Sequence, residues 1–287
     1  MIPKTFRNSP VPRDQDWLAT LPAAIEHRLA VWDLRPDGPV THGSHALVIP
    51  VTRENNPLVL RMNAPSEDVT AHIEALRFWQ GRGTVHLVDA DPTAGAMLLE
   101  RLDMHHSALN LPSEEAMEVL GVMARRLAVP APPTARSTAD LALARADSLE
   151  PDWLRQGKPF DRAILRAGEK AVETLVTTQS ALAVNGDLHS AQVLAGTREP
   201  WLTVDPILLR GDIAYDLARV LWTRLDDMPD RVAITEHLDI VVDAAQLNRD
   251  QARNWVVFRA VDYWLWGLDA GLTEDPLRCH RLITALT

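Results

Sequence analysis

The residues best suited to chemistry in this 287-residue chain are two acids and an amide in its second half. Gln192 follows Asp187 by five residues, and Asp205 comes directly after the apolar run at 201–204. In phosphoryl transfer, one carboxylate accepts the proton of the attacking hydroxyl. An amide oxygen and a second carboxylate bind the magnesium ion on the phosphates. The spacing therefore predicts transfer of a phosphoryl group from a metal-bound nucleotide to a hydroxyl.

Short apolar runs around these residues indicate the strands that must position them. The runs at 193–194 and 201–204 have strand-like composition, and residues 196–200 between them have the composition of a turn. Another apolar run leads into the first acid. We expect the two later runs to form a β-hairpin that brings Asp187 and Asp205 together in one cleft.

The same stretch resembles the aminoglycoside phosphotransferases, in particular the streptomycin 6-kinase and hydroxyurea phosphotransferase branch. That branch carries HGDLHxxN, then a DP pair, then GDxxxDLA. Here the chain reads NGDLHSAQ, then DP at 205–206, then GDIAYDLA at 211–218. The resemblance implies Asp187 as catalytic base and Gln192 and Asp205 as ligands of Mg²⁺. It also implies ATP as the phosphoryl donor, with GTP as the alternative.

The resemblance implies the α+β, two-lobed fold of protein kinases, and the remaining sequence agrees with it. Residues 1–101 hold strand-like segments interrupted by a helix at 66–79, which is typical of a small β-rich lobe. Helical patterns dominate from residue 112 onward. We therefore expect a nucleotide-binding lobe at 1–101. A larger, mostly helical lobe at 102–287 is expected to carry the catalytic hairpin and the acceptor site.

Five residues of the first lobe are candidates for nucleotide binding. Arg61 occupies the position expected for the phosphate-binding lysine of kinase-like folds, and Glu74 on the helix is its expected partner. Ser44 lies in a segment that is either a phosphate-facing loop or a plain turn. Glu100 and Leu102 border the expected hinge, where kinase-like folds bind adenine through backbone groups.

The acceptor is expected in the second lobe, where the signal is weaker. Asp212 is a candidate acid on the acceptor side, and Asp262 and Trp266 lie in an aromatic-rich segment. Carboxylates there would pair with the guanidinium groups of a cationic aminoglycoside such as streptomycin. Hydroxyurea, an amino sugar or a natural-product intermediate fit the same branch. The expected partner is thus a small-molecule acceptor of open identity.

Composition excludes several other classes. The formal net charge of −10 argues against a nucleic-acid partner, which would require a basic surface. The single cysteine, Cys279, excludes an internal disulfide and a multi-cysteine metal site. The N-terminus lacks the apolar core of a signal peptide, and no apolar run approaches the length of a membrane span. We expect a cytoplasmic monomer or homodimer without a membrane partner.

Three departures from the family pattern keep other functions open. Arg61, Asn185 and Gln192 stand where the family has lysine, histidine and asparagine. The alternative function is therefore a regulatory pseudokinase that binds nucleotide with weak or no transfer. A third hypothesis, from another class, is a metal-independent ligand-binding module built on helices. Magnesium-ATP would not stabilise such a module against heat.

Overall fold

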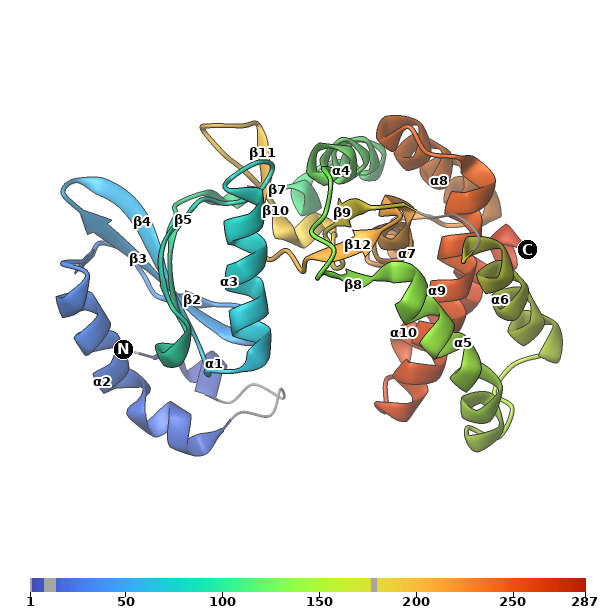
Figure 1. The fold of residues 1–287 in the computed structure, drawn as a ribbon, viewed down its shortest axis with the longest axis horizontal. Coiled ribbons are helices and arrows are strands. Elements are labelled where there is room, and N and C mark those ends of the chain that lie inside the picture. Colours follow the sequence, from blue (N-terminus) through green and yellow to red (C-terminus); the bar gives the residue numbers. More distant parts are fainter. Residues whose placement is uncertain (1, 8–13, 177–179) are drawn as a thin grey trace. The chain divides into compact units, whose positions relative to one another are not determined.

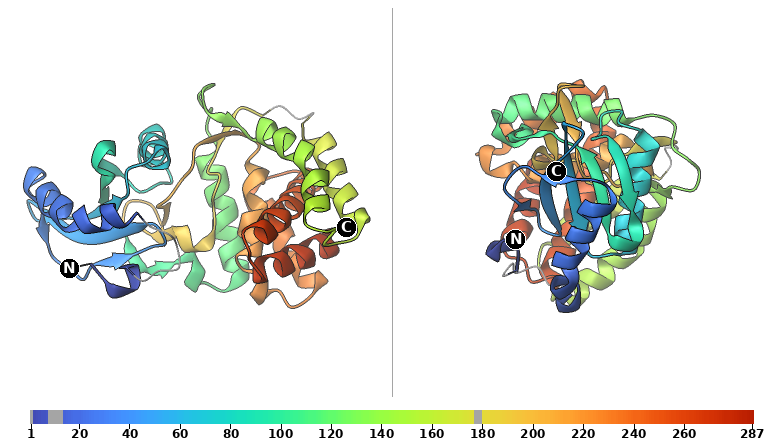
Figure 2. Two further views of the ribbon diagram at one scale, coloured as in Figure 1. Left: turned by 90° about the horizontal axis from the view of Figure 1, so that it is seen from below. Right: turned by 90° about the vertical axis from the view of Figure 1, so that its left-hand side faces the viewer.

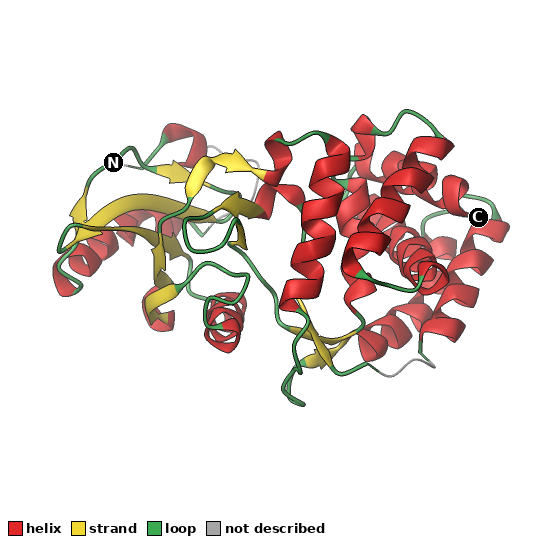
Figure 3. Ribbon diagram, turned by 90° about the horizontal axis from the view of Figure 1, so that it is seen from above, coloured by secondary structure: helices red, strands yellow, loops and turns green. Residues whose placement is uncertain are grey.

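The structure is a computed structural model that describes residues 2–7, 14–176 and 180–287. The chain divides into two compact units, Met1–Asp103 and Met104–Thr287, and we call them the N-terminal and C-terminal units. This division lies close to the expected boundary after residue 101. Strands are concentrated in the N-terminal unit and helices in the C-terminal unit (Figures 1 and 3).

The N-terminal unit is built on an antiparallel sheet. In spatial order its strands are β1 (Arg35–Pro36), β3 (Ala46–Arg53), β4 (Asn56–Asn63), β6 (Ala96–Glu100) and β5 (Leu87–Asp91), with β2 (Thr41–His42) paired to β3. Long strands β3 and β4 form a hairpin around Glu54 and Asn55, which both have positive φ. These strands confirm the strand-like segments predicted before the helix at 66–79.

Side-chain alternation along the strands decides which face of this sheet is buried. Leu47, Ile49 and Leu60 point to one face and pack with Leu21 in a single apolar cluster. The helices of this unit are α1 (Lys4–Arg7), α2 (Gln15–Val31) and α3 (Glu67–Trp79). Leu21 belongs to α2, which therefore covers this face of the sheet (Figure 2).

The predicted helix after the β3–β4 hairpin is α3, and its ends follow from local chemistry. The Ser66 hydroxyl accepts a hydrogen bond from the Val69 amide at the N-terminus, and Gln80 ends the helix in a left-handed conformation. Ile73, Leu76 and their apolar neighbours on the same face are buried. One side of α3 is therefore committed to packing and the other faces solvent.

The C-terminal unit is mostly helical. Its α-helices are α4 (Ser113–Leu127), α5 (Thr138–Arg155), α6 (Arg162–Leu175), α7 (Leu217–Trp222), α8 (Arg231–Ala245), α9 (Arg249–Asp269) and α10 (Glu274–Leu286). Helix α9 packs against α5, α6, α7, α8 and α10. Its buried residues include Trp255, Phe258 and Val261, which belong to the main apolar cluster of this unit. The core of the C-terminal unit is therefore centred on α9.

Two small sheets of the C-terminal unit carry the predicted motif. One has the order β11 (Trp201–Thr203), β10 (Val193–Ala195), β7 (Asp103–Ser107), and the other has the order β8 (Arg136–Ser137), β12 (Leu209–Gly211), β9 (Leu182–Val184). Strands β10 and β11 are antiparallel neighbours, so the hairpin predicted from the motif is confirmed. Strand β9, which leads into the motif, pairs with β12 instead of with the hairpin.

Candidate active site

The loop after β9 has a backbone conformation that requires glycine. Gly186 has a φ of +82°, and a Cβ built there would lie 3.1 Å from the Ile207 carbonyl oxygen and 3.1 Å from Leu209 Cδ1. The Ile207 amide in turn donates a 2.7 Å hydrogen bond to the Asn185 carbonyl. The loop therefore turns sharply against the segment that follows β11, and it presents Asp187 immediately after the turn.

Three groups hold Asp187. Its backbone amide donates to Asn185 Oδ1 at 3.1 Å, and Gln192 Nε2 donates to its Oδ2 at 2.9 Å. Arg219 Nε lies 2.8 Å from Oδ1, in an ion pair that lacks the alignment of a hydrogen bond. Asn185 also donates to Thr203 Oγ1 of β11 at 3.4 Å. The asparagine at the family's histidine position thus ties the loop to the hairpin.

The hairpin places Gln192 and Asp205 on neighbouring segments of the chain. The Val204 amide donates to the Gln192 carbonyl at 3.0 Å, so Asp205 follows directly beyond the paired residues. The side-chain oxygen of Gln192, Oε1, is buried and has no hydrogen-bond donor among the described residues. An amide oxygen and a carboxylate are both ligands that Mg²⁺ accepts. Gln192 and Asp205 thus offer oxygens of the kind that Mg²⁺ binds, and the described residues contain no group of three or more His, Cys, Asp or Glu arranged around a metal.

His189 lies close enough to both acids to respond to their charges. Burial is the main cause that lowers the pKa of His189, and the positive charge of Arg219 lowers it further. The negative charges of Asp187 and Asp205 act in the opposite direction. Both carboxylates are therefore within electrostatic reach of the His189 imidazole. The imidazole itself is largely buried and favours the neutral form.

Asp216 stabilises the loop at Gly186 through a side-chain hydrogen bond. Its Oδ2 accepts a 3.3 Å hydrogen bond from the Gly186 amide, and the residue is 1% exposed. Burial raises the pKa of Asp216 to about 7, against the opposing effects of the Arg259 charge and the Gly186 amide. The hydrogen bond to Gly186 therefore ties Asp216 to the loop that presents Asp187.

In the N-terminal unit the predicted pair of Arg61 and Glu74 is not formed. Arg61 lies on β4, and its Nε donates to Asn63 Oδ1 at 3.2 Å. Glu74 lies on the exposed face of α3 and makes no ion pair among the described residues. The buried face of this helix carries His72 as its polar group instead. Sequence spacing identified an acid on the helix without fixing which face it occupies, and a role for Glu74 in nucleotide binding stays a prediction.

The other nucleotide candidates lie at the ends of strands in the N-terminal sheet or just beyond them. Ser44 is exposed in the tight turn between β2 and β3, where the Gly43 amide donates to the Ala46 carbonyl at 3.0 Å. Glu100 Oε2 accepts a 3.0 Å hydrogen bond from the His86 amide at the end of β6. Leu102 is half-buried just after that strand. Their roles in binding nucleotide stay predictions.

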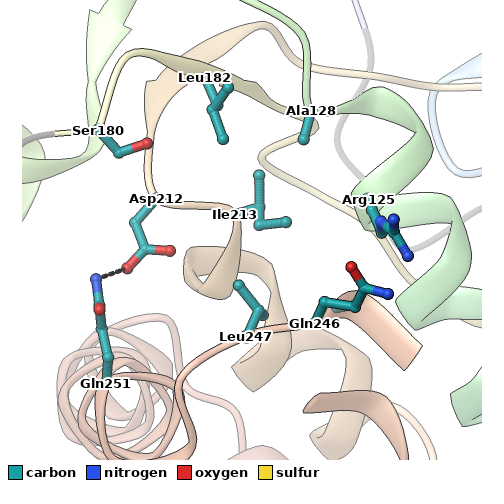
Figure 4. A pocket seen from close by; sticks show the side chains of 10 residues that line it. Arg125, Ala128, Ser180, Leu182, Asp212, Ile213, Gln246, Leu247 and Gln251 are labelled. Carbon is teal, nitrogen blue, oxygen red and sulfur yellow. Dashed lines mark hydrogen bonds between the residues drawn. The ribbon is translucent and has the colours of Figure 1, made fainter. Parts of the chain in front are cut away.

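Asp212 is not brought together with Asp187. Strands β9 and β12 are antiparallel, with Val184 opposite Leu209, so Asp212 and Asp187 lie beyond opposite ends of the pair. Both carboxylate oxygens of Asp212 are occupied. Oδ1 accepts from the Ala214 amide at 3.0 Å. Oδ2 accepts from Gln251 Nε2 (Figure 4) and, at 2.7 Å, from Trp255 Nε1. We therefore leave Asp212 out of the acceptor site.

Asp262 and Trp266 behave differently from each other. Asp262 Oδ1 lies 2.6 Å from Arg145 Nε, so its charge is already neutralised by an arginine of α5. The Trp266 side chain is 52% exposed, and its ring stacks on Tyr263 at 5.1 Å between centroids. A free carboxylate for a cationic acceptor is thus not provided by Asp262, whereas Trp266 presents an aromatic surface.

Arg219 is the residue of this site that sequence reasoning missed. It follows Asp216 by three residues, in a helix whose other members are all buried. A single charge in the apolar segment LARVLW was the available signal. Its partner Asp187 is distant in sequence, so the pairing becomes visible only in the folded chain.

Comparisons with known proteins agree with this geometry. Residues 31–271 match the family model described as aminoglycoside/hydroxyurea antibiotic resistance kinase. The streptomycin 6-kinase of Streptomyces glaucescens is 37% identical over 270 residues, which cover 91% of this chain and 88% of that protein. The hydroxyurea phosphotransferase of Kitasatospora aureofaciens is 32% identical over 271 residues, which cover 92% and 78% respectively.

Solved structures show the same fold at low sequence identity. Aminoglycoside phosphotransferase APH(4)-Ia superposes with a TM-score of 0.63 at 14% identity, over 92% of this chain and 99% of that one. Choline kinase LicA from Streptococcus pneumoniae gives 0.60 at 12% identity, over 93% and 98%. The predicted kinase-like α+β fold is confirmed. Because the family match spans most of its length, the chain belongs to the aminoglycoside/hydroxyurea antibiotic resistance kinases.

Proposed function

We propose that the C-terminal unit transfers the terminal phosphoryl group of a nucleoside triphosphate to a hydroxyl of a small acceptor, with Asp187 as the catalytic base. The observation that carries this proposal is the arrangement of Asp187, Gln192 and Asp205 around one loop and hairpin. The relatives are named as kinases and phosphotransferases, which favours an active enzyme over the pseudokinase alternative.

The proposed step is a direct displacement at phosphorus. The acceptor hydroxyl gives its proton to a carboxylate oxygen of Asp187, and its oxygen forms a bond to the γ-phosphorus. The bond from that phosphorus to the bridging oxygen breaks, and the nucleoside diphosphate leaves with the electron pair. Because the transition state is loose, positioning and charge neutralisation supply most of the rate.

Asp205 and Gln192 are the residues that we propose to hold Mg²⁺. The unpartnered Oε1 of Gln192 supports this assignment, since a buried amide oxygen without a donor can accept a cation. A bound Mg²⁺ would neutralise charge on the phosphates. With only two protein ligands, the remaining positions would go to phosphate oxygens and water, as is usual for this ion.

For the nucleotide, we propose ATP, with GTP as the alternative. A related thermostable mutant of APH(4)-Ia was solved with ADP and hygromycin B, and another with AMP-PNP and hygromycin B. Arg61 is the proposed phosphate-binding side chain, with Ser44 in the adjacent turn. Glu100 and Leu102 are proposed to flank the adenine. Glu74 is exposed and makes no ion pair among the described residues, so it is the least supported member of this set.

For the acceptor, we propose a compound of the aminoglycoside class, with streptomycin tested first and hydroxyurea second. The names of the relatives support this order, because the streptomycin 6-kinases share more identity with this chain than the hydroxyurea enzyme. Trp266 is a proposed contact because its ring is exposed. Asp262 is proposed to act only through its pair with Arg145.

We further propose that the protein acts in the cytoplasm as a monomer or homodimer, without nucleic acid. The net charge of −10 supports the last point. Among the helices in the described ranges, none is both long and apolar enough to cross a bilayer.

The test is an acceptor panel. Purified protein is incubated with magnesium-ATP or magnesium-GTP and, separately, streptomycin, hydroxyurea and other hydroxylated amino sugars, while ADP or GDP formation and the mass of the acceptor are followed. We expect a phosphate gain on at least one acceptor. Nucleotide that raises the unfolding temperature without any phosphorylated product would support the pseudokinase. If the protein is a metal-independent ligand-binding module, magnesium-nucleotide would leave its unfolding temperature unchanged. A nucleotide-binding protein would instead be stabilised by about 4 kcal/mol when the nucleotide is at 1,000 times its Kd.

A further inference from the structure

Both oxygens of the Asp187 carboxylate are held by side chains from separate elements. Gln192, the last residue of the 3₁₀ helix η3 (Ser190–Gln192), donates from Nε2 to Oδ2 at 2.9 Å. Arg219 belongs to helix α7, and its Nε lies 2.8 Å from Oδ1. We propose that Arg219 is a positioning residue, which fixes the rotation of the catalytic carboxylate so that it meets the acceptor hydroxyl. This inference rests on the proposed role of Asp187 as base.

Arg219 is itself firmly placed. Its helix begins directly after Asp216, which hydrogen-bonds the Gly186 amide, so α7 contacts both the backbone and the side chain of the catalytic loop. The guanidinium carbon lies 5.8 Å from the centre of the Trp222 ring on the same helix. Trp222 stacks on Tyr263 with centroids 4.4 Å apart and planes 6° apart. Packed rings thus limit the movement of the helix that carries Arg219.

The ion pair of Arg219 and Asp187 is partly shielded from solvent, so the attraction between the two charges is only partly screened. The Arg219 and Asp187 side chains are 27% and 29% exposed, so solvent screens them only in part. Since Nε is not aligned for a hydrogen bond, charge rather than hydrogen-bond geometry holds Oδ1. Without Arg219, the Gln192 hydrogen bond is the one that the described residues still make to the carboxylate, which gains freedom to rotate. An aspartate on one hydrogen bond would spend less time in the reactive orientation.

The experiment compares Arg219→Ala, Arg219→Lys and the matched control Arg231→Ala in the full chain. Arg231 is an exposed arginine at the start of α8 whose side chain has no partner among the described residues. Steady-state phosphorylation is measured with magnesium-ATP and the first acceptor of the panel that the wild type phosphorylates, starting with streptomycin. Each variant is assayed with and without added guanidinium ion, and thermal unfolding verifies that it is folded.

For Arg219→Ala we expect kcat to fall roughly 10- to 100-fold, with both KM values within about twofold, because orientation is lost while binding is retained. Added guanidinium is expected to recover part of the activity, and Arg219→Lys to retain more activity than Arg219→Ala. Arg231→Ala is expected to match the wild type.

Three outcomes would overturn the positioning role while leaving the proposed function intact. They are an unchanged kcat in Arg219→Ala, a loss that appears mainly as a higher nucleotide KM, and a lower unfolding temperature with no rescue by guanidinium. The second would mean that Arg219 binds phosphate, and the third that it is structural. A folded wild type that phosphorylates no acceptor of the panel would overturn the proposed function and this inference with it.

Discussion

The buried carboxyl of Asp216 makes the stability of the protein depend on pH in a direction opposite to that of most aspartates. Burial raises the pKa of Asp216 to about 7, and the nearby negative charge of Asp187 adds to this effect. In the unfolded chain the same group would have a pKa of about 3.9. Between these values the folded protein holds a proton that the unfolded chain has released, so this group destabilises the fold progressively as pH rises from about 4 to 7.

The size of the effect follows from the two pKa values. Each pH unit between them changes the free energy of unfolding by about 1.4 kcal/mol. From pH 5 to pH 8, Asp216 is therefore expected to lower wild-type stability by roughly 2–3 kcal/mol. Asp216→Asn removes the titration yet keeps an oxygen that can accept from the Gly186 amide. Relative to the wild type, the variant should gain that amount over this pH range.

Urea unfolding followed by tryptophan fluorescence measures this difference, since the chain contains nine tryptophans. Wild type, Asp216→Asn and the exposed control Asp243→Asn are compared at pH 5, 6, 7 and 8. We expect the control to differ from the wild type by an almost constant amount. A constant difference for Asp216→Asn, or one that favours the wild type as pH rises, would refute the reasoning.

Three further changes test other parts of the structure. Arg224→Met removes a buried guanidinium that donates to the carbonyls of Ala108, Leu109 and Leu111. Urea unfolding is expected to show that the free energy of unfolding falls by roughly 2–4 kcal/mol. A fall below about 1 kcal/mol would contradict this. Gly186→Ala, at a φ of +82°, is expected to cost about 1–3 kcal/mol and most of the activity in the phosphorylation assay. Gln192→Ala is expected to raise the Mg²⁺ concentration needed for half-maximal activity roughly tenfold, and an unchanged requirement would remove Gln192 from the metal site.

Features that depend on residues close together in the sequence could be predicted from it. Short apolar runs and a turn predicted the β10–β11 hairpin, and the five-residue spacing from Asp187 singled out Gln192. These features are local, because a few residues decide whether a strand forms and where it turns. The helical lobe and the helix at 66–79 were predictable for the same reason.

Features that depend on packing between distant segments were not predictable. The acid chosen on α3, Glu74, turned out to face solvent, because only the packed helix decides which side is inward. Asp212 lies in a motif close to Asp187 and Asp205 in sequence, yet the antiparallel pairing of β9 and β12 places it beyond the opposite end of the pair from Asp187. Arg219 was missed because its contact with Asp187 joins two segments through tertiary structure alone.

The most direct test of the central claim compares wild type and Asp187→Asn in a single turnover with magnesium-ATP and the first acceptor that the wild type phosphorylates. Nucleotide affinity is measured in parallel by calorimetry. We expect transfer to slow by at least about 100-fold, the usual contribution of a general base, while nucleotide affinity changes by less than about threefold. A folded, nucleotide-binding Asp187→Asn variant that transfers phosphate at nearly the wild-type rate would contradict the assignment of Asp187 as the base.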